Sequence, residues 1–116
     1  MTGPDLIDRH FGIHASALKL RSQRLDILAS NIANAATPGY KARDLDFGAA
    51  LAAANTGQAA PTLKFRQPVQ ASLDGNTVEL ATEQTAFADN ALRYRASLSF
   101  LSGRIQTMMS ALKGGE

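Results

Sequence analysis

The stretch Phe87–Leu112, FADNALRYRASLSFLSGRIQTMMSAL, decides the fold of this chain. Apolar residues recur along it at intervals of alternately four and three positions, the 3.5-residue repeat of a helix that buries one narrow seam against another helix. The seam consists of Phe87, Ala91, Tyr94, Leu98, Leu101, Ile105, Met108 and Leu112. Most residues between these positions are polar, so the stretch predicts a long helix that needs a helical partner.

A second series with the same period lies near the N-terminus. It contains Phe11, His14, Leu18, Arg21, Leu25, Leu28, Ile32 and Ala35. We expect a helix over residues 8–35, roughly 40 Å long, and a C-terminal helix over residues 77–113. Because their lengths and periods match, the two helices should pack as an antiparallel coiled-coil hairpin. The predicted class is all-α, with a single domain over residues 1–116.

The N-terminal helix carries a second apolar stripe, formed by Ile13, Leu20 and Ile27. It lies roughly 100° or more around the helix from the first series, so one neighbouring helix cannot cover both. Either the middle of the chain folds over this stripe, or another subunit does. Because the middle is poor in core material, the pattern slightly favours a subunit.

The connector, residues 36–76, is expected to be poorly ordered or irregular, because it is rich in alanine and Pro61 and Pro68 interrupt its second half. Within it the sequence allows an extended stretch, a short helix and a short strand, at residues 41–47, 48–54 and 63–65. Asp74-Gly75-Asn76 marks a turn. Asn76 and Glu79 have the spacing of a helix N-cap and its returning carboxylate, which predicts that the last helix begins near residue 77.

Composition excludes several classes of protein. The 116 residues carry a net charge of only +2 and contain neither cysteine nor tryptophan. Disulfides, thiolate catalysis and cysteine-type zinc sites are therefore excluded, and no dense basic stripe points to nucleic acid. No secretory signal and no membrane-spanning segment are visible in the sequence. If the protein works outside the cytoplasm, it should leave by a route that reads no such signal.

A distinctive stretch ends the first helix, SNIANAATPGYK at residues 30–41. Pro38 stops the helix, and Pro-Gly suits the two central positions of a type II turn, with Gly39 at positive φ. Asn31 and Asn34 lie where side-chain amides can bond unpaired carbonyl groups.

The combination of the Asn-x-x-Asn pair with Thr37-Pro38-Gly39-Tyr40 resembles the N-terminal signature of the flagellar rod and hook axial proteins. Independently, residues 74–116 are similar to the C-terminal half of the proximal rod members of that family, through Gly-Asn-x-Val, Asn-Ala-Leu-x-Tyr-x-Ala-Ser-Leu and Ala-Leu-Lys-Gly. The alanine-rich connector, and Gln84 where a methionine is expected, depart from the pattern. Neither departure affects the resemblance, but both leave the fold of the middle open.

The resemblance implies a structural subunit of the proximal rod of the bacterial flagellar basal body, in the periplasm. Such proteins are made in the cytoplasm, leave unfolded through the flagellar type III export gate without a cleaved signal, and polymerise into a helical rod that transmits torque. The implied partners are copies of the chain, other rod proteins, MS-ring and rod-base adaptor proteins and the export gate, with no cofactor, nucleic acid or small-molecule substrate. Phe47 and Leu51 resemble the element that early export substrates present to the gate.

Other interpretations of the sequence fit it less well. His10 and His14 have the spacing of a zinc-binding pair but no third ligand, and Asp44 and Asp46 could form a carboxylate pair but lie on a stretch without a pocket. A cytoplasmic helical adaptor or export chaperone would show the same seam without the Thr-Pro-Gly-Tyr turn. A peripheral membrane helix would need bulkier aromatic residues. Another short rod protein remains the nearest alternative.

The seam also predicts how stable the chain is alone. Its apolar burial and the conformational entropy lost on ordering two helices nearly cancel. We therefore expect a partly unfolded monomer that becomes ordered when neighbouring subunits cover its remaining apolar surface.

Overall fold

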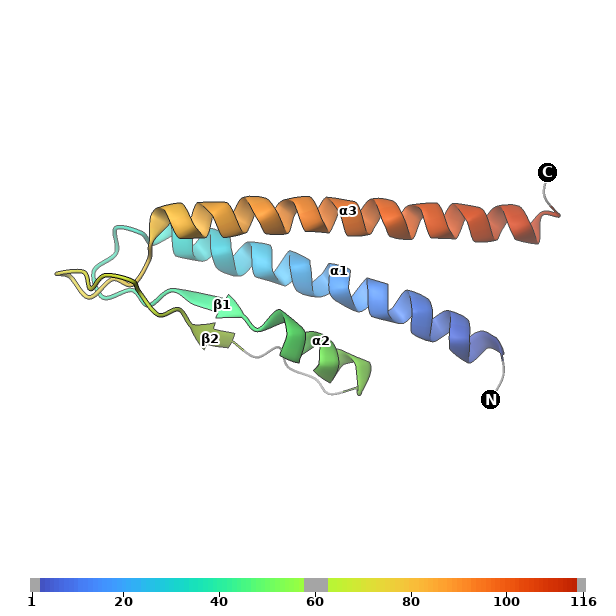
Figure 1. The fold of residues 1–116 in the computed structure, drawn as a ribbon, viewed down its shortest axis with the longest axis horizontal. Helices are drawn as coiled ribbons and strands as arrows, with labels where there is room; N and C mark the ends of the chain where they lie inside the picture. The colour runs from blue at the N-terminus through green and yellow to red at the C-terminus, as the bar shows by residue number, and fades with distance from the viewer. Residues whose placement is uncertain (1–2, 58–62, 115–116) are drawn as a thin grey trace.

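Three helices and one small sheet make up the fold. The structure is a computed structural model that describes residues 3–57 and 63–114. The order of elements is α1 (Gly3–Ala33), β1 (Arg43–Leu45), α2 (Phe47–Asn55), β2 (Leu63–Phe65) and α3 (Leu80–Leu112). Figure 1 shows α1 and α3 side by side and running in opposite directions, with β1, β2 and α2 below α1 in that view. The molecule is elongated, with principal extents of 64 × 29 × 17 Å.

The two long helices are present as the apolar repeats predict, but their ends differ. α1 begins at Gly3 instead of residue 8, with Pro4 in the first turn, where a missing N–H costs nothing. It ends at Ala33, and residues 34–36 continue as a turn. α3 begins at Leu80 instead of residue 77, because Asn76 is occupied elsewhere, and ends at Leu112.

The connector is more regular than expected. β1 and β2 pair antiparallel, with Asp44 opposite Lys64. α2 is capped by Asp46, whose Oδ1 accepts a hydrogen bond from the Ala49 N–H at 3.2 Å. The expectation of a poorly ordered or irregular segment is therefore wrong for residues 43–55 and 63–65, whereas residues 36–42 and 66–76 are irregular as expected. The extended stretch, the short helix and the short strand are confirmed. Residues 58–62 lie outside the described part.

The apolar core lies between α1 and this folded connector. Leu20, Leu45 and Ala50 are buried together, and Ile27, Phe47 and Leu51 pack against them. Two members of the second apolar stripe, Leu20 and Ile27, are thus covered within the chain, which corrects the expectation that a subunit covers the whole stripe. Only its third member, Ile13, stays 39% exposed. The physical reason is that α2 supplies core material despite its alanine-rich composition.

The face of α3 that meets α1 is more polar than the repeat predicts. Glu83 and Asn90, seven residues apart, are fully buried, and Phe87, Tyr94, Leu101 and Met108 beside them are half-buried. Three expected seam residues are instead exposed, Leu98 at 44%, Ile105 at 45% and Leu112 at 82%. On α1, Leu28 is buried and Leu18, Leu25 and Ile32 are half-buried. The seam assignment is therefore wrong for Leu98, Ile105 and Leu112, because the polar side chains of Glu83 and Asn90 share the line that faces α1.

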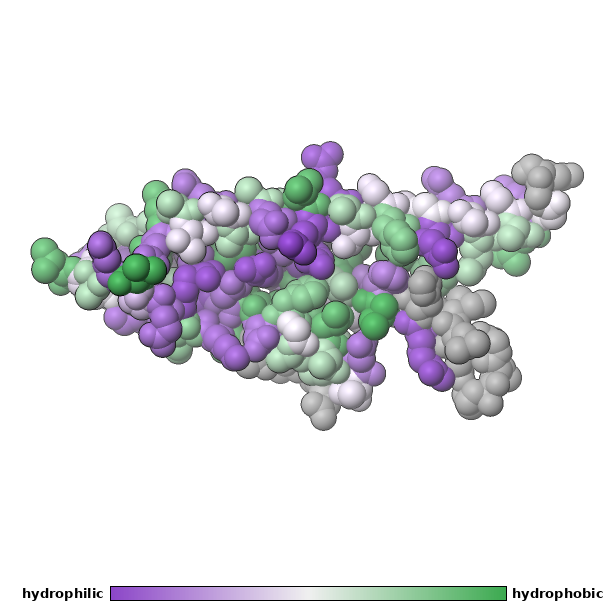
Figure 2. Space-filling model, viewed as in Figure 1, coloured by the Kyte–Doolittle hydropathy of each residue, from purple (hydrophilic) through white to green (hydrophobic). Residues whose placement is uncertain are grey.

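The view of the surface in Figure 2 agrees with this division. Hydrophilic residues form a band over the part of the molecule where β1, α1 and α3 meet, and hydrophobic residues gather over α2 and along the far end of α3. No helix within residues 3–57 and 63–114 is long and apolar enough to cross a membrane.

Candidate functional site

The end of the molecule where α1 turns into the connector is built on a type II turn. The Tyr40 N–H donates to the Thr37 carbonyl at 3.2 Å, which closes the turn around Pro38 and Gly39. Gly39 has φ +76, the positive value that the second central position of this turn requires. The turn chemistry predicted from the sequence is therefore confirmed.

Asn31 uses its whole amide to join three elements. Its Nδ2 donates to the Arg43 carbonyl at 2.6 Å and to the Glu83 carboxylate at 3.0 Å. Its Oδ1 accepts from the Arg43 N–H at 3.2 Å and from the Tyr40 hydroxyl at 3.3 Å. Because the side chain is fully buried, every one of these bonds replaces water. Asn31 therefore fixes β1 and α3 against the end of α1.

The second asparagine of the motif closes the helix end. Asn34 donates through Nδ2 to the Ser30 carbonyl at 2.8 Å and accepts through Oδ1 from the Thr37 hydroxyl at 3.0 Å. Ser30 also shares a hydrogen bond with the Tyr40 hydroxyl at 3.2 Å. These bonds satisfy groups that a helix end leaves unpaired.

Asn76 has a different role from the one expected. Its Nδ2 lies within hydrogen-bond distance of three carbonyls at the end of α1, those of Asn34 at 2.9 Å, Ala35 at 3.1 Å and Thr37 at 2.7 Å. Its Oδ1 accepts from the Val78 N–H at 2.7 Å. The N-cap residue of α3 is Glu79, which makes no side-chain cap bond. Asn76 is thus a cap for the C-terminal end of α1, supplied from residues next to α3.

The two turns at this end also pair through their backbones. The Gly39 N–H donates to the Asp74 carbonyl at 2.8 Å, and the Thr77 N–H donates to the Tyr40 carbonyl at 2.9 Å. Gly75 has φ +77, and a Cβ placed there would lie 3.7 Å from Gly39 Cα. The segment before α3 is thereby bound to the segment after α1, so the end of the hairpin is closed by backbone as well as side chains.

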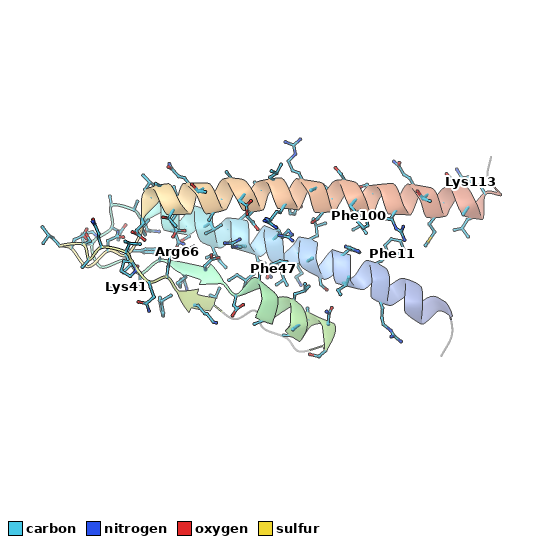
Figure 3. All side chains as sticks on the ribbon, in the orientation of Figure 1. Phe11, Lys41, Phe47, Arg66, Phe100 and Lys113 are labelled. Atoms are coloured by element: carbon cyan, nitrogen blue, oxygen red, sulfur yellow. The ribbon has the colours of Figure 1, made fainter. Side chains whose placement is uncertain are left out.

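Next to the turns, a chain of ion pairs links α1, the sheet and α3. Arg24 binds Asp44 through two hydrogen bonds, of 2.8 and 2.9 Å. Arg66 binds the same carboxylate at 2.8 Å and reaches Glu83 through its Nε. Glu83 is fully buried and also accepts from Asn31. We call Arg24, Asp44, Arg66 and Glu83 the ionic chain. Figure 3 labels Arg66, which contacts both carboxylates of this chain.

The ionic chain changes the titration of its members. Burial alone would raise the pKa of Asp44, but the hydrogen bonds and charge of Arg24, the Leu45 N–H and Arg66 together lower it below its usual value. The hydrogen bond to Asp44 raises the pKa of Arg24. Both groups are therefore held in their charged forms in the folded protein.

The middle of the long helix pair holds a second polar contact. Asn90 donates through Nδ2 to the Arg21 carbonyl at 2.8 Å, and the Arg21 guanidinium lies 4.5 Å from the centroid of the Phe47 ring. Burial lowers the pKa of Arg21. Phe47 and Leu51, the expected export element, are both half-buried in this part of the fold.

The residues considered as catalytic or metal-binding candidates make contacts that hold the fold together. Asp44 belongs to the ionic chain, while Asp46 caps α2 and binds Lys64 at 2.7 Å. The centroid of the His14 ring on α1 lies 4.9 Å from that of the Phe100 ring on α3. Within the described residues, no group of three possible metal ligands occurs.

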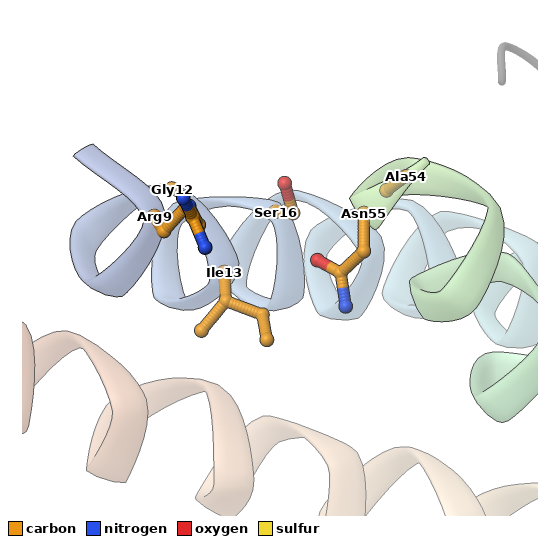
Figure 4. A pocket seen from close by; sticks show the side chains of 6 residues that line it. All are labelled: Arg9, Gly12, Ile13, Ser16, Ala54 and Asn55. Atoms are coloured by element: carbon orange, nitrogen blue, oxygen red, sulfur yellow. The ribbon is translucent and has the colours of Figure 1, made fainter. Parts of the chain in front are cut away.

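A pocket of about 410 Å³ lies between the first half of α1 and the end of α2 (Figure 4). Its lining contains Arg9, Gly12, Ile13, Ser16, Ala54 and Asn55. Arg9 is the one charged residue of this lining, and it is exposed. The lining contains no nucleophile paired with a base.

Sequence reasoning located the turn residues but missed the ionic chain and the roles of Asn76 and Asn90. The available signal was the seven-residue spacing of Glu83 and Asn90 beside the apolar seam, which places two polar residues on one line of the helix. Arg24 and Arg66 gave no such signal, because a lone arginine is most often solvated.

Comparison with known proteins gives a consistent result. A model of the family described as flagella basal body rod protein matches residues 11–41. This range covers most of α1 and the turn that follows it. The flagellar basal body rod protein FlgB of Cereibacter sphaeroides is 50% identical, over 89% of this chain and 93% of the relative. The proteins of the same name from Escherichia coli K12 and Salmonella typhimurium LT2 are 45% and 42% identical, over 96% of this chain and 98% of each relative.

Proposed function

The chain belongs to the FlgB family of flagellar basal body rod proteins, and from this membership we propose how it takes its place in the rod. It is a structural subunit of the proximal rod in the flagellar basal body, and not an enzyme. The proposal concerns its assembly, its partners and its export, and it follows from the difference between the two ends of the α1–α3 pair.

The closed end, where Asn31, Asn76 and the ionic chain lie, is proposed to set the geometry of the subunit before it meets any partner. In the rod, α1 and α3 then pack as an antiparallel coiled-coil hairpin whose remaining apolar positions are covered by helices of neighbouring basal-body proteins. Support comes from the exposed fractions of Leu98, Ile105 and Leu112 on α3, 44%, 45% and 82%. Contacts that repeat without closing into a ring would give the helical growth and torque transmission that a rod needs.

Copies of the chain are proposed to meet through Ile13 and the pocket beside it. Ile13 is 39% exposed and lines that pocket together with the end of α2. A second exposed apolar site is the loop between β2 and α3, where Val69 is 86% and Leu73 109% exposed. Other rod proteins and the MS-ring or rod-base adaptor proteins are the proposed partners of the surfaces that copies of the chain leave free.

Export is proposed to precede folding. The chain would be made in the cytoplasm and pass unfolded through the flagellar type III gate to the periplasmic rod, without a cleaved signal. Phe47 and Leu51 would serve as the element that the gate reads. In the folded chain both pack against the core formed by Leu20, Leu45 and Ala50, so the gate could read them only before α2 docks on α1.

The proposed function rests on one observation, that both the Nδ2 and the Oδ1 of Asn31 are fully hydrogen-bonded. Through these bonds the turn signature of the family holds α1, β1 and α3 together. The test is complementation of a strain that lacks this protein with the Asn31→Leu variant. We expect no swimming, and isolated basal bodies without a rod. A Gln84→Met variant, changed at an exposed position of α3, is the control and should swim normally. Normal rods with Asn31→Leu would contradict the proposal.

A further inference from the structure

The C-terminal part of α3 has an unusual distribution of charge. Residues 90–113 carry four basic side chains, and no aspartate or glutamate occurs among them. The basic residues are Arg93, Arg95, Arg104 and Lys113, and all of them are exposed. Arg93 is compensated by Asp89, one turn earlier, at 2.9 Å.

An uncovered apolar line runs along the same part of the helix. Leu98, Ile105, Met109 and Leu112 follow one another at intervals of seven, four and three residues, which places them on one face of the helix. Their exposed fractions are 44%, 45%, 52% and 82%. We call these four residues the shoulder stripe, because they lie beside the line of Glu83 and Asn90 that faces α1. Arg95 precedes the stripe by three residues and Lys113 follows it.

The spacing of the shoulder stripe matches the a and d positions of a heptad repeat, so its natural occupant is another helix. The helices of a second copy fit poorly, because none of them is acidic. α1 carries four basic and three acidic residues, α2 carries no charged residue, and α3 would bring like charges against the same basic residues. Like charges facing each other across an interface oppose association.

Resting on the proposed function, we propose that the shoulder stripe receives an acidic amphipathic helix of a different protein of the basal body. Leucine-type residues of the partner would cover the stripe. Its carboxylates would lie beside Arg95 and Lys113, where they gain from charge complementarity. This contact would give the subunit one face for a different protein and leave Ile13 and its pocket for copies of itself.

Two designed peptides test the inference on the full chain. Each has three heptads with leucine at a and d; one has glutamate at e and g, the other lysine. Fluorescence anisotropy of the labelled peptides should show saturable binding of the glutamate peptide and at least tenfold weaker binding of the lysine peptide. Raising the salt concentration should weaken the glutamate complex, because part of the attraction is screened. Equal binding of both peptides would overturn the proposal.

Matched variants locate the site. Ile105→Asp should weaken binding of the glutamate peptide at least tenfold, while Leu92→Asp, at a 68% exposed position outside the stripe, should leave it unchanged. Arg95→Gln should weaken it about two- to fivefold, the range of an exposed ion pair. Arg93→Gln also removes one positive charge, but Arg93 lies on the face of α3 that carries Phe100 and not on the face of the stripe. This variant should therefore bind the glutamate peptide as the unmodified chain does. Equal losses for both arginine variants would contradict the proposed face.

Two further measurements distinguish the proposed partner from two other possible occupants of the shoulder stripe, a membrane surface and a second copy of the chain. Binding of the chain to phosphatidylglycerol vesicles that depends on Ile105, with no binding of the glutamate peptide, would overturn the proposal in favour of a membrane surface. Self-association in sedimentation that Ile105→Asp abolishes would overturn it in favour of a second copy. Failure of this peptide binding in a protein that still builds rods would remove this inference alone, whereas the proposed function fails only if rods form normally with Asn31→Leu.

Discussion

The two ends of the α1–α3 pair are held by different kinds of interaction. At the closed end, Asn31 and Asn76 bind backbone carbonyls, and Glu83 is fully buried beside Arg66. At the open end, where the chain termini lie (Figure 1), the described contact between rings joins His14 and Phe100, and the residues of the shoulder stripe are exposed. Directional polar bonds thus fix the geometry at one end, while apolar surface is left for partners at the other.

The difference explains how a small chain can be both specific and ready to assemble. Hydrogen bonds and ion pairs depend steeply on geometry, so a polar closed end selects one register of α1 against α3. Apolar burial is less directional and scales with area, so the same surface can be covered later by a neighbour. The comparison predicts that substitutions at the closed end lower the free energy of unfolding, and that substitutions at the open end change assembly.

The largest loss of stability is expected for Glu83→Leu. The variant leaves the Arg66 guanidinium without one of its carboxylates and Asn31 without one of its two acceptors, which should lower the free energy of unfolding by about 3 kcal/mol. Urea denaturation followed by circular dichroism measures it. The double variant Glu83→Leu/Arg66→Met should recover part of the loss. A loss below about 0.5 kcal/mol for the single variant would mean that the closed end is not held by the ionic chain.

A slightly smaller effect is expected for Asn31→Asp. The substitution keeps the shape of the side chain but removes both N–H donors and places a carboxylate next to Glu83, at a cost of about 2 kcal/mol. Asn55→Asp, at an exposed position of α2, is the matched control and should change stability by less than about 0.5 kcal/mol. The same urea titration compares them, and equal effects of the two variants would contradict the role given to Asn31.

Acid should weaken the closed end selectively. Because the folded protein lowers the pKa of Asp44 below its usual value of 3.8, ionised Asp44 contributes stability above that pH. This contribution is lost as the pH falls through the lowered value. Unfolding free energies measured between pH 7 and pH 2 should therefore fall most steeply below about pH 4. An Asp44→Asn variant should show a shallower fall, and identical slopes would exclude Asp44 as a source of the pH dependence.

The cap from Asn76 should contribute less. Asn76→Ala removes the Nδ2 contacts with three carbonyls at the end of α1 and should lower the free energy of unfolding by about 1 kcal/mol, the usual effect of losing a capping side chain. Thermal denaturation with a Leu73→Ala control, at a fully exposed position of the same loop, provides the measurement. A melting temperature equal to that of the unmodified chain would show that backbone pairing alone closes this end.

The smallest effect on the isolated chain is expected for Leu98→Asp at the open end. Leu98 is 44% exposed, so the free energy of unfolding should change by about 0.5 kcal/mol or less. Incorporation into rods should nevertheless be lost, because in the assembly the carboxylate would be buried without a partner. Motility on soft agar and rod content of basal bodies measure this. Normal motility would contradict the assignment of the shoulder stripe to assembly.

Much of the fold could be predicted from the sequence because local rules decide it. The apolar repeat predicts both long helices, and Pro38-Gly39 predicts the turn with Gly39 at positive φ. The exact residues facing α1 could not be predicted, because a 3.5-residue repeat allows a helix to rotate by a fraction of a turn. Glu83 and Asn90 settle that rotation, and their partners come from α1 and from the segment after β2.

The covering of Leu20 and Ile27 by α2 could not be predicted for a related reason. Alanine-rich segments bury little surface per residue, so composition alone favoured a subunit as the cover. Ala50 nevertheless fits closely against Leu20 and Leu45, which a larger residue would push apart. The role of Asn76 was hidden because its three acceptors lie about forty residues away in the chain.

Hydrogen–deuterium exchange along α3 tests the central claim most directly, since it reports local opening residue by residue. In the isolated chain, amides near Glu83 and Asn90 should be protected, and those from Leu98 to Leu112 should exchange at least tenfold faster. In isolated basal bodies the second group should become protected as well. Uniform protection of α3 in the isolated chain, or unchanged fast exchange of residues 98–112 in the rod, would contradict the account.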